Sequence, residues 1–108
     1  MLGVVVADCE GRHRFTYSGP KKGSTLLPQG ICTDALSHIL VCDAETKTVQ
    51  MIDKNGSFLS YLLTELSPGM VRPYAISYDP NTHLLFVSTQ YNKISVYKFI
   101  DRRHFLTF

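Results

Sequence analysis

The sequence predicts an all-β protein assembled from repeated groups of short strands, as in a β-propeller. The first observation is that PQGICTDALSHILVCD, from Pro28 to Asp43, returns as PYAISYDPNTHLLFVS, from Pro73 to Ser88, at an offset of 45 residues. The second is that each repeat reads as about four short strands separated by tight turns. Repeats of 20 to 50 residues are typical of solenoids, propellers and arrays, and four strands per repeat favour a propeller blade.

The repeat is carried by residues that usually determine structure. The matched pairs are Pro28 with Pro73, Ile31 with Ile76, Asp34 with Asp79, His38 with His83, and Leu40 with Leu85. The register continues to Val49 and Met51, which align with Ile94 and Val96. Read backward at the same offset, the segment 4–11 aligns with the segment 49–56. The repeat is therefore present, at least in part, three times.

Tight turns divide the chain into the strands that we expect. Val4–Ala7 and Arg12–Tyr17 form a predicted hairpin, and the Gly- and Pro-containing segment 19–28 is a predicted loop. The further predicted strands are 30–34, 39–43, 48–53, 57–63, 74–79, 84–89 and 94–99. Asn55-Gly56 between apolar strands is a strong hairpin signal, because both residues tolerate positive φ. The hairpin of the two earlier copies would continue into the tail 100–108, which has no glycine at the turn.

Several predicted strands are apolar on both faces, although their tight turns require an antiparallel sheet. FLSYLL at 58–63 and LLFV at 84–87 are examples. An isolated antiparallel sheet usually exposes one face to water, whereas propeller blades are covered on both faces by their neighbours. An immunoglobulin-like sandwich is the alternative, but it gives no reason for a 45-residue recurrence.

Composition sets limits on the class of protein. The 108 residues are 44% hydrophobic and 19% charged, with a net charge of +2, which fits one globular domain and permits an acidic partner without requiring one. No apolar run approaches the roughly 18 residues of a membrane span, and the first residues lack the basic flank of a signal peptide. Cys9, Cys32 and Cys42 form no CxxC pair. We expect a cytoplasmic protein with no membrane partner, no disulfide framework and no metal site in this segment.

The repeat motif identifies a kind of propeller. The pattern is P-x-G/A-I-x-x-D, an apolar strand ending near an aspartate, and then V/I-x-M/V, and it resembles the NHL repeat. In the first copy it is carried by Pro28, Gly30, Ile31, Asp34, 39–43, Val49, Met51 and Gly56; in the second by Pro73, Ala75, Ile76, Asp79, 84–88, Ile94 and Val96. The second copy departs from the pattern with Ala75 at the glycine and Ser88 at the strand-end aspartate.

The longer phrases GRHRFTYSGP and LLPQGICTDALSHILVCDAETKTVQMIDKNGSFLSYLL resemble the NHL domains of tripartite-motif (TRIM) proteins of bivalve molluscs. This resemblance implies a fragment of a propeller of about six blades and roughly 270 residues, because each blade needs neighbours on both sides. Residues 1–19 would be the last two strands of one blade, 20–64 a complete blade, and 65–108 the next blade, incomplete or degenerate after residue 100. The complete protein would be a RING-type E3 ubiquitin ligase with zinc in its RING and B-box domains, outside this segment.

Most residues that could perform chemistry have a structural explanation. His38 and His83 occupy one repeat position at a turn, where a catalytic base would have no reason to recur. Asp34, Asp43, Asp53 and Asp79 lie at turns and strand ends, where a carboxylate caps backbone N–H groups. Asn55-Gly56-Ser57 matches a glycosylation triplet, but we interpret it as a turn. We therefore predict no catalytic residue.

A surface of basic and aromatic residues is the predicted binding site. In a propeller, the loops before the first strand and between the second and third strands share one face. That face would carry Lys21, Lys22, Lys47, Arg72, Tyr74, Tyr91 and Lys93. Cations and rings suit single-stranded RNA, and the resemblance implies that this face binds RNA or protein. The alternatives are an ordinary solvated surface, a lactonase-type propeller hydrolase with carboxylates converging on a central channel, and a truncated product without independent function.

Overall fold

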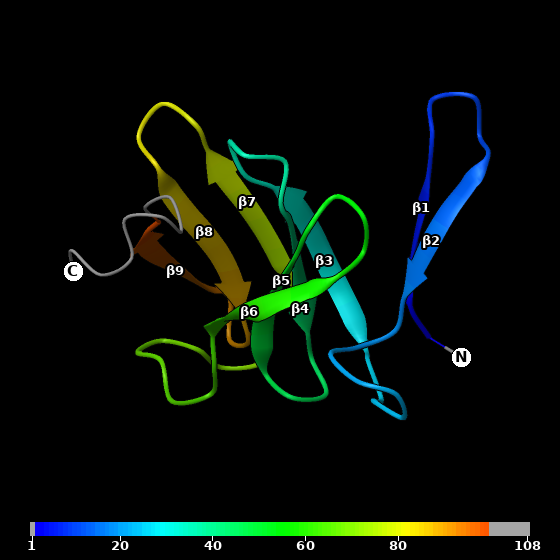
Figure 1. Ribbon diagram of the computed structural model, residues 1–108. Helices are drawn as coiled ribbons and strands as arrows, with labels where there is room; N and C mark the ends of the chain where they lie inside the picture. Colours follow the sequence, from blue (N-terminus) through cyan, green and yellow to red (C-terminus); the bar gives the residue numbers. More distant parts are fainter. Residues whose placement is uncertain (1, 100–108) are drawn as a thin grey trace.

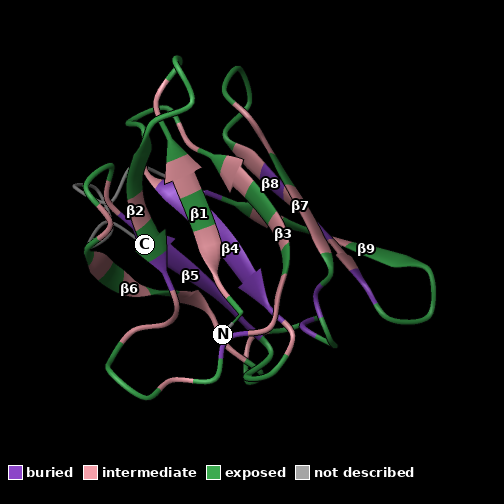
Figure 2. Ribbon diagram, turned by 90° about the vertical axis from the view of Figure 1, so that its right-hand side faces the viewer, coloured by how far each residue is buried: buried purple, intermediate pink, exposed green. Residues whose placement is uncertain are grey.

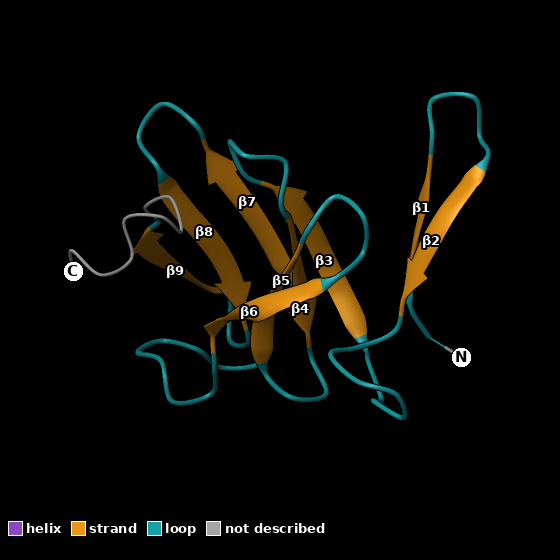
Figure 3. Ribbon diagram, in the orientation of Figure 1, coloured by secondary structure: helices purple, strands orange, loops and turns teal. Residues whose placement is uncertain are grey.

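The computed structural model describes residues 2–99 of the chain, which contain nine strands and no helix (Figures 1 and 3). The strands are β1 (Val4–Ala7), β2 (His13–Tyr17), β3 (Pro28–Thr33), β4 (Ile39–Asp43), β5 (Thr48–Ile52), β6 (Phe58–Leu63), β7 (Ala75–Asp79), β8 (Leu84–Thr89) and β9 (Lys93–Lys98). The predicted all-β class is confirmed. The predicted hairpin of the tail 100–108 lies outside the described residues. No helix of the described part is long and apolar enough to cross a membrane.

The strands form three antiparallel sheets, and within each sheet the strands that pair are consecutive in the sequence. β1 and β2 form a hairpin, β3 to β6 form a four-stranded sheet, and β7 to β9 form a three-stranded sheet. The repeat seen in the sequence is also present in the structure, because β1 and β2 precede β5 and β6 by one repeat and β7 to β9 follow β3 to β5 by one repeat. Figure 1 shows the three sheets side by side, with the four-stranded sheet in the middle.

The middle sheet is covered on both faces, as its apolar strands require. On one face Val41 and Ile52 pack with Tyr17 and the hairpin β1–β2. On the other face Leu40 and Met51 pack with Leu85 and the sheet β7–β9. Accordingly, every residue of β4 and β5 is buried (Figure 2). The two faces of the middle sheet therefore form two separate hydrophobic cores.

Each of the first two sheets packs against the next sheet along the chain through the equivalent one of its two faces. Val4 and Val6 of the hairpin lie one repeat before Val49 and Met51, and each pair faces the following sheet. The outer face of the third sheet, which bears Phe86 and Ile94, corresponds to the face of the middle sheet that β7–β9 covers. Within the described residues that outer face is open and contains a hollow of about 310 Å³ lined by Ala75, Ile76, Ser77, Phe86, Ser88 and Ile94. The middle sheet thus presents one face to the preceding hairpin and the other to the following sheet.

Gly30 is required by the close approach of β7 to β3. A Cβ on Gly30 would lie 2.9 Å from the Cα of Ala75 and 3.0 Å from the carbonyl oxygen of Tyr74. Real Cβ atoms are almost never found so close to backbone atoms. The glycine of the repeat motif therefore lets the first strands of two neighbouring sheets come into contact.

Three of the turns share one design, a three-residue loop capped by an aspartate. In each, the aspartate Oδ1 accepts hydrogen bonds from the N–H groups two and four residues later, as Asp53 does from Asn55 and Ser57 at 2.9 Å. Asp8 and Asp34 repeat this pattern. The hairpin predicted at Asn55-Gly56 is confirmed. Its turn type is different, because Gly56 (φ 97°) has positive φ and Asn55 does not.

The sequence alignment of the second copy is wrong by one residue in β8. Ala75 pairs with Ser88, whereas Gly30 pairs with Cys42, so β8 is displaced by one position relative to β4. In register, Leu85 corresponds to Ile39 instead of Leu40, and Thr89 corresponds to Asp43. The predicted equivalence of His38 and His83 is also wrong. In register His83 corresponds to Ser37, and these two residues share a positive φ (57° and 65°), which His38 does not have.

The extra residue has a local cause. Asp79 accepts hydrogen bonds from Asn81 N–H (3.0 Å) and from Thr82 Oγ1 (2.8 Å). Asp43 does the same with Glu45 N–H and Thr46 Oγ1. The pattern Asp-x-x-Thr therefore builds a four-residue turn in both places, where Asp-x-x-Gly or Asp-x-x-Ser builds a three-residue turn. The turn β8–β9 is one residue shorter than β4–β5, which restores the repeat offset at β9.

Candidate functional site

The antiparallel topology gathers two kinds of loop at one end of the sheets, as the sequence predicted. At this end β3 and β7 begin and the turns β4–β5 and β8–β9 lie. The Ala44 N–H donates to the Leu27 carbonyl at 3.0 Å, and the Gln90 N–H donates to the Val71 carbonyl at 2.9 Å. We call it the Asp43 end. The turns β3–β4, β5–β6 and β7–β8 lie at the opposite end.

A cavity of about 310 Å³ opens at the Asp43 end, between the middle and third sheets. Its walls come from the beginnings of β3 and β7 and from the turns β4–β5 and β8–β9. The lining residues are Leu27, Gln29, Ala44, Arg72, Pro73, Tyr74, Gln90, Tyr91 and Asn92. Both repeats contribute, so the site depends on the junction between two sheets.

The structure brings together three of the seven predicted binding residues, namely Arg72, Tyr74 and Tyr91. The four lysines Lys21, Lys22, Lys47 and Lys93 are exposed but do not line the cavity. Three carboxamide side chains that the sequence analysis missed, those of Gln29, Gln90 and Asn92, do line it. Gln90 and Asn92 flank the predicted Tyr91 in the turn β8–β9, and Gln29 lies at the beginning of β3, so a search of these segments for all polar side chains would have found them.

The backbone around the cavity holds unusual conformations. Six non-glycine residues of the described part have positive φ, and three of them line this cavity: Arg72 (43°), Tyr91 (69°) and Asn92 (58°). Positive φ is sterically unfavourable for arginine and tyrosine. Tyr91 lies in the short turn β8–β9 and is 74% exposed. Tyr74 is 45% exposed. Both rings are therefore accessible to a ligand.

A buried polar network lies behind the cavity. The carboxylate of Asp43, 2% exposed, accepts hydrogen bonds from Leu27 N–H (2.9 Å), Glu45 N–H (3.0 Å), Thr46 Oγ1 (2.7 Å) and Gln50 Nε2 (3.2 Å). Gln50 Oε1 in turn accepts a hydrogen bond of 2.5 Å from the Tyr17 hydroxyl. Burial, with smaller contributions from Tyr61 and Asp43, raises the pKa of Tyr17 above its ordinary value, so the phenol stays a donor. The network fixes Leu27, which lines the cavity.

The charge of the cavity is positive. Arg72 supplies the cation, and within residues 2–99 no aspartate or glutamate lines the cavity. Among the described residues, Arg72 forms no ion pair. An exposed guanidinium without a carboxylate partner is available to an anionic ligand.

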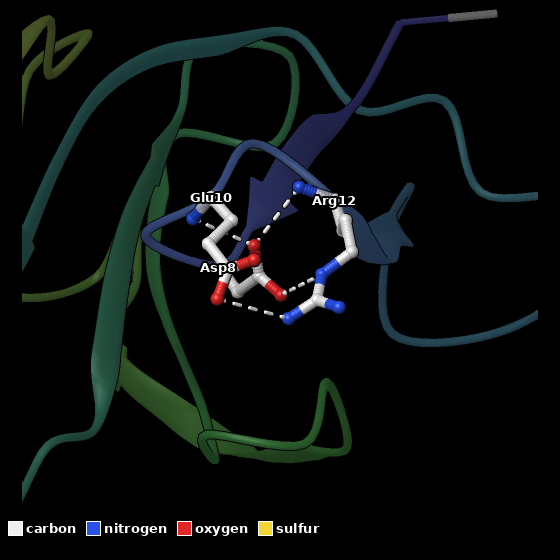
Figure 4. Close-up of polar contacts among 3 residues, drawn as sticks. All are labelled: Asp8, Glu10 and Arg12. Carbon is white, nitrogen blue, oxygen red and sulfur yellow. Dashed lines mark hydrogen bonds and ion pairs between the residues drawn. The ribbon is translucent and has the colours of Figure 1, made fainter.

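Several other titratable groups of the described part have partners within the fold. Arg12 Nε donates to Asp8 Oδ2 at 2.9 Å, and Arg12 Nη2 lies 3.4 Å from Glu10 Oε1 (Figure 4). His38 Nδ1 lies 2.7 Å from Asp34 Oδ2, which fixes the ring at its turn. The Tyr78 hydroxyl and His83 Nδ1 are 2.5 Å apart. The predicted capping role of the aspartates is confirmed, and the two histidines have different partners.

The cysteines differ in environment. Burial raises the pKa of the Cys32 thiol to about 11 and that of the Cys42 thiol to about 12, whereas Cys9 is exposed. In residues 2–99 no group of three or more His, Cys, Asp or Glu side chains is placed to hold a metal ion. Cys32 and Cys42 are therefore packing residues.

The cavity at the Asp43 end, with its guanidinium, carboxamides and exposed rings, can bind an anionic or polar ligand.

Comparison with known proteins does not extend these observations. No protein-family model and no curated protein matches the chain.

Proposed function

We propose that this chain is an interaction module, part of an NHL-type β-propeller that recruits a protein or RNA target at the Asp43 end. The observation that carries the proposal is the cavity in which Arg72 and Tyr74, from the loop before β7, converge with Tyr91, from the turn β8–β9. A cation that has no carboxylate partner in the described part of the chain and two accessible rings provide charge and stacking surface, which are the main sources of affinity for peptides and single-stranded nucleic acids.

The propeller assignment is supported by the way the sheets stack. Three sheets follow one another in the same sense, each covering the next with the same face, whereas an immunoglobulin-like sandwich has two sheets around one core. The contact at Gly30 and Ala75 lies between first strands, so neighbouring sheets are closest at the strands that would surround a propeller axis. These features favour blades over a sandwich.

A lactonase-type hydrolase would need carboxylates that converge on one end of the propeller. The carboxylates of Asp8, Asp34, Asp43, Asp53 and Asp79 instead accept hydrogen bonds from their own turns. The lining of the cavity contains amides, phenols and one guanidinium. This chemistry favours binding over hydrolysis.

The binding proposal can be tested with two ligand libraries. The 108-residue chain is used to select ligands from a random single-stranded RNA pool and from a library of linear peptides. The recovered ligands are then measured by fluorescence anisotropy against Tyr91→Ala and against Leu36→Ala, a control at the opposite end. Loss of one stacked ring should weaken binding by about 1–3 kcal/mol, with no change for the control. Failure to recover ligands of either class, or equal binding by both variants, would contradict the proposal.

The resemblance to TRIM proteins leads to a second, separate part of the proposal. The parent protein would be an E3 ubiquitin ligase, with this segment recognising its targets. An antibody raised to residues 19–28 would identify the native polypeptide in the source tissue. A species several times larger than 12.2 kDa with clustered cysteines and histidines near its N-terminus is expected. A native species of 12.2 kDa would rule out the ligase.

A further inference from the structure

We propose that the cavity at the Asp43 end binds a carboxylate carried by an extended peptide, with Arg72 as its partner. This inference rests on the proposed interaction function and makes it specific. The target is then a protein and not RNA, and the group that anchors it in the cavity is a carboxylate. The carboxylate can belong to an acidic side chain or to a peptide C-terminus, because both offer the same two oxygens.

The number of cations at the site favours a single carboxylate. Single-stranded RNA presents a phosphate at every nucleotide, and proteins that bind it without sequence preference use positively charged grooves that follow the backbone. Among the described residues, one guanidinium lines the cavity, while Lys21, Lys22, Lys47 and Lys93 lie outside its lining. A planar guanidinium matches the two oxygens of one carboxylate in a bidentate pair. The site is therefore equipped for one anion.

The remaining polar groups suit a peptide backbone. Gln29, Gln90 and Asn92 each carry a carboxamide, which has both donors and an acceptor. A peptide group also offers one donor and one acceptor, so carboxamides can bind it in either direction. Tyr74 and Tyr91 provide exposed rings against which the residues beside the carboxylate can pack.

The size of the cavity fits an anchoring group. A volume of about 310 Å³ is at the lower limit of sites for small ligands, which begin at roughly 300 Å³. It can hold one side chain or chain terminus with part of the adjoining backbone, and the rest of the ligand would lie across Tyr91. An extended segment presents such a group without unfolding of its parent protein.

The site is also held in place before a ligand arrives. Leu27 is fixed by the Asp43 carboxylate, and Ala44 is fixed by the Leu27 carbonyl. The Val71 carbonyl accepts the N–H of Gln90, which joins the two loops that carry Arg72 and Tyr91. Little ordering is then required on binding, which favours measurable affinity for a short peptide.

The test uses peptides selected from the linear library on the 108-residue chain. Selected peptides should share an aspartate or glutamate at one position, or a free C-terminus. Synthetic labelled versions are compared with Asp→Asn or Glu→Gln forms and with C-terminal amides, which separates the two sources of carboxylate. Binding is measured to the wild type, Arg72→Gln, Arg72→Lys and Lys54→Gln, a cation at the opposite end.

Neutralising the peptide carboxylate or Arg72 should each weaken binding about tenfold, as expected for a charge-assisted bidentate pair. Both changes together should weaken it no more than either alone, because they remove the same interaction. Arg72→Lys should restore part of the affinity, and Lys54→Gln should have no effect. Unchanged thermal unfolding of Arg72→Gln would show that the effect is local.

Three results would overturn the proposal. The first is selected peptides without a shared carboxylate, and the second is losses that multiply in the double change. The third is displacement of the peptides by single-stranded RNA with a steep salt dependence, which would identify nucleic acid as the occupant. Ligands that require Tyr91 but not Arg72 would leave the interaction module intact, whereas the absence of any ligand would end both proposals.

Discussion

Gly30 and Ala75 lie so close together that a Cβ on Gly30 would be 2.9 Å from the Cα of Ala75. The contact joins β3 to β7, the first strands of two successive sheets. It involves backbone atoms, which cannot rotate away as a flexible side chain can. The distance between the two sheets is therefore limited at this residue, and the apolar side chains of the core are packed to that distance.

Gly30→Ala should force β3 and β7 apart and lower the free energy of unfolding by about 1–3 kcal/mol, as overpacking in a dense core does. Ser77→Ala, on the exposed side of β7, is the control and should change it by less than about 0.5 kcal/mol. The comparison is made by urea denaturation followed by circular dichroism. Equal stability of the two variants would mean that the sheets separate without cost.

Asp43→Asn should destabilise the protein more than Asp53→Asn, although both aspartates cap a turn. At Asp43 the new amide nitrogen would face the Gln50 amide donor, and turning the Gln50 amide would leave the Tyr17 hydroxyl proton without its acceptor. A buried donor without an acceptor costs about 1–3 kcal/mol. Asp53 receives bonds from its own loop, which an asparagine oxygen can also accept. Thermal unfolding of the two variants decides the order.

The displaced register of β8 can be tested with two adjacent leucines. Leu85 is 2% exposed and faces the middle sheet, whereas Leu84 is partly exposed on the outer face. Leu85→Ala should cost about 2–5 kcal/mol, as for other buried leucines. Leu84→Ala should cost less than half as much. The reverse order in denaturation experiments would restore the register that the sequence alignment predicted.

The cysteines should react with iodoacetamide in a fixed order. Cys9 is exposed, while burial raises the pKa of Cys32 to about 11 and of Cys42 to about 12, so these two thiols stay protonated near neutral pH. The thiolate is the reactive form. Mass spectrometry of the native protein should find Cys9 alkylated first, with Cys32 and Cys42 modified after addition of urea. Early modification of Cys42 would show that the core between the sheets opens readily.

Acid should destabilise the protein through its capping aspartates. The Thr82 hydroxyl and Asn81 N–H lower the pKa of Asp79, and the backbone N–H of Arg12 does the same for Asp8. A lowered folded-state pKa means that the unfolded state takes up protons first, so the stabilisation is complete above about pH 4 and is lost as pH falls through the folded-state pKa. Asp79→Asn should lose less stability than the wild type between about pH 6 and about pH 3. An identical loss would show that Asp79 does not contribute.

Much of the fold could be predicted because its signals are local. Apolar strands, Asp-x-x-Gly turns and the 45-residue repeat each specify structure within a few residues. The register of β8 could not be predicted in this way, because Leu84, Leu85, Phe86 and Val87 are all apolar and support either face inward. Thr82 at the third position after Asp79 was the distinguishing signal, since it closes a four-residue turn with the aspartate.

The binding site was predictable only as a set of loops. Topology places the loops of Arg72, Tyr74 and Tyr91 at one end of the sheets, and this the sequence could indicate. Which side chains reach a shared cavity depends on turn length and on the positive φ of Arg72, Tyr91 and Asn92. The lysines of the same loops lie outside the cavity because sharing an end of a sheet does not require side chains to converge.

Because each sheet covers the next with the equivalent face, the two outer faces of the described part of the molecule are different. The exposed side of the hairpin β1–β2 carries Val5, Arg14 and Thr16, while the exposed side of β7–β9 within the described residues carries Phe86, Ile94 and Val96. Any further sheet added beyond β9 meets a surface that resembles an interior, and any sheet added before β1 meets a more polar one. Assembly along this axis is therefore directional, and two molecules joined through these surfaces would associate head to tail instead of through a two-fold axis.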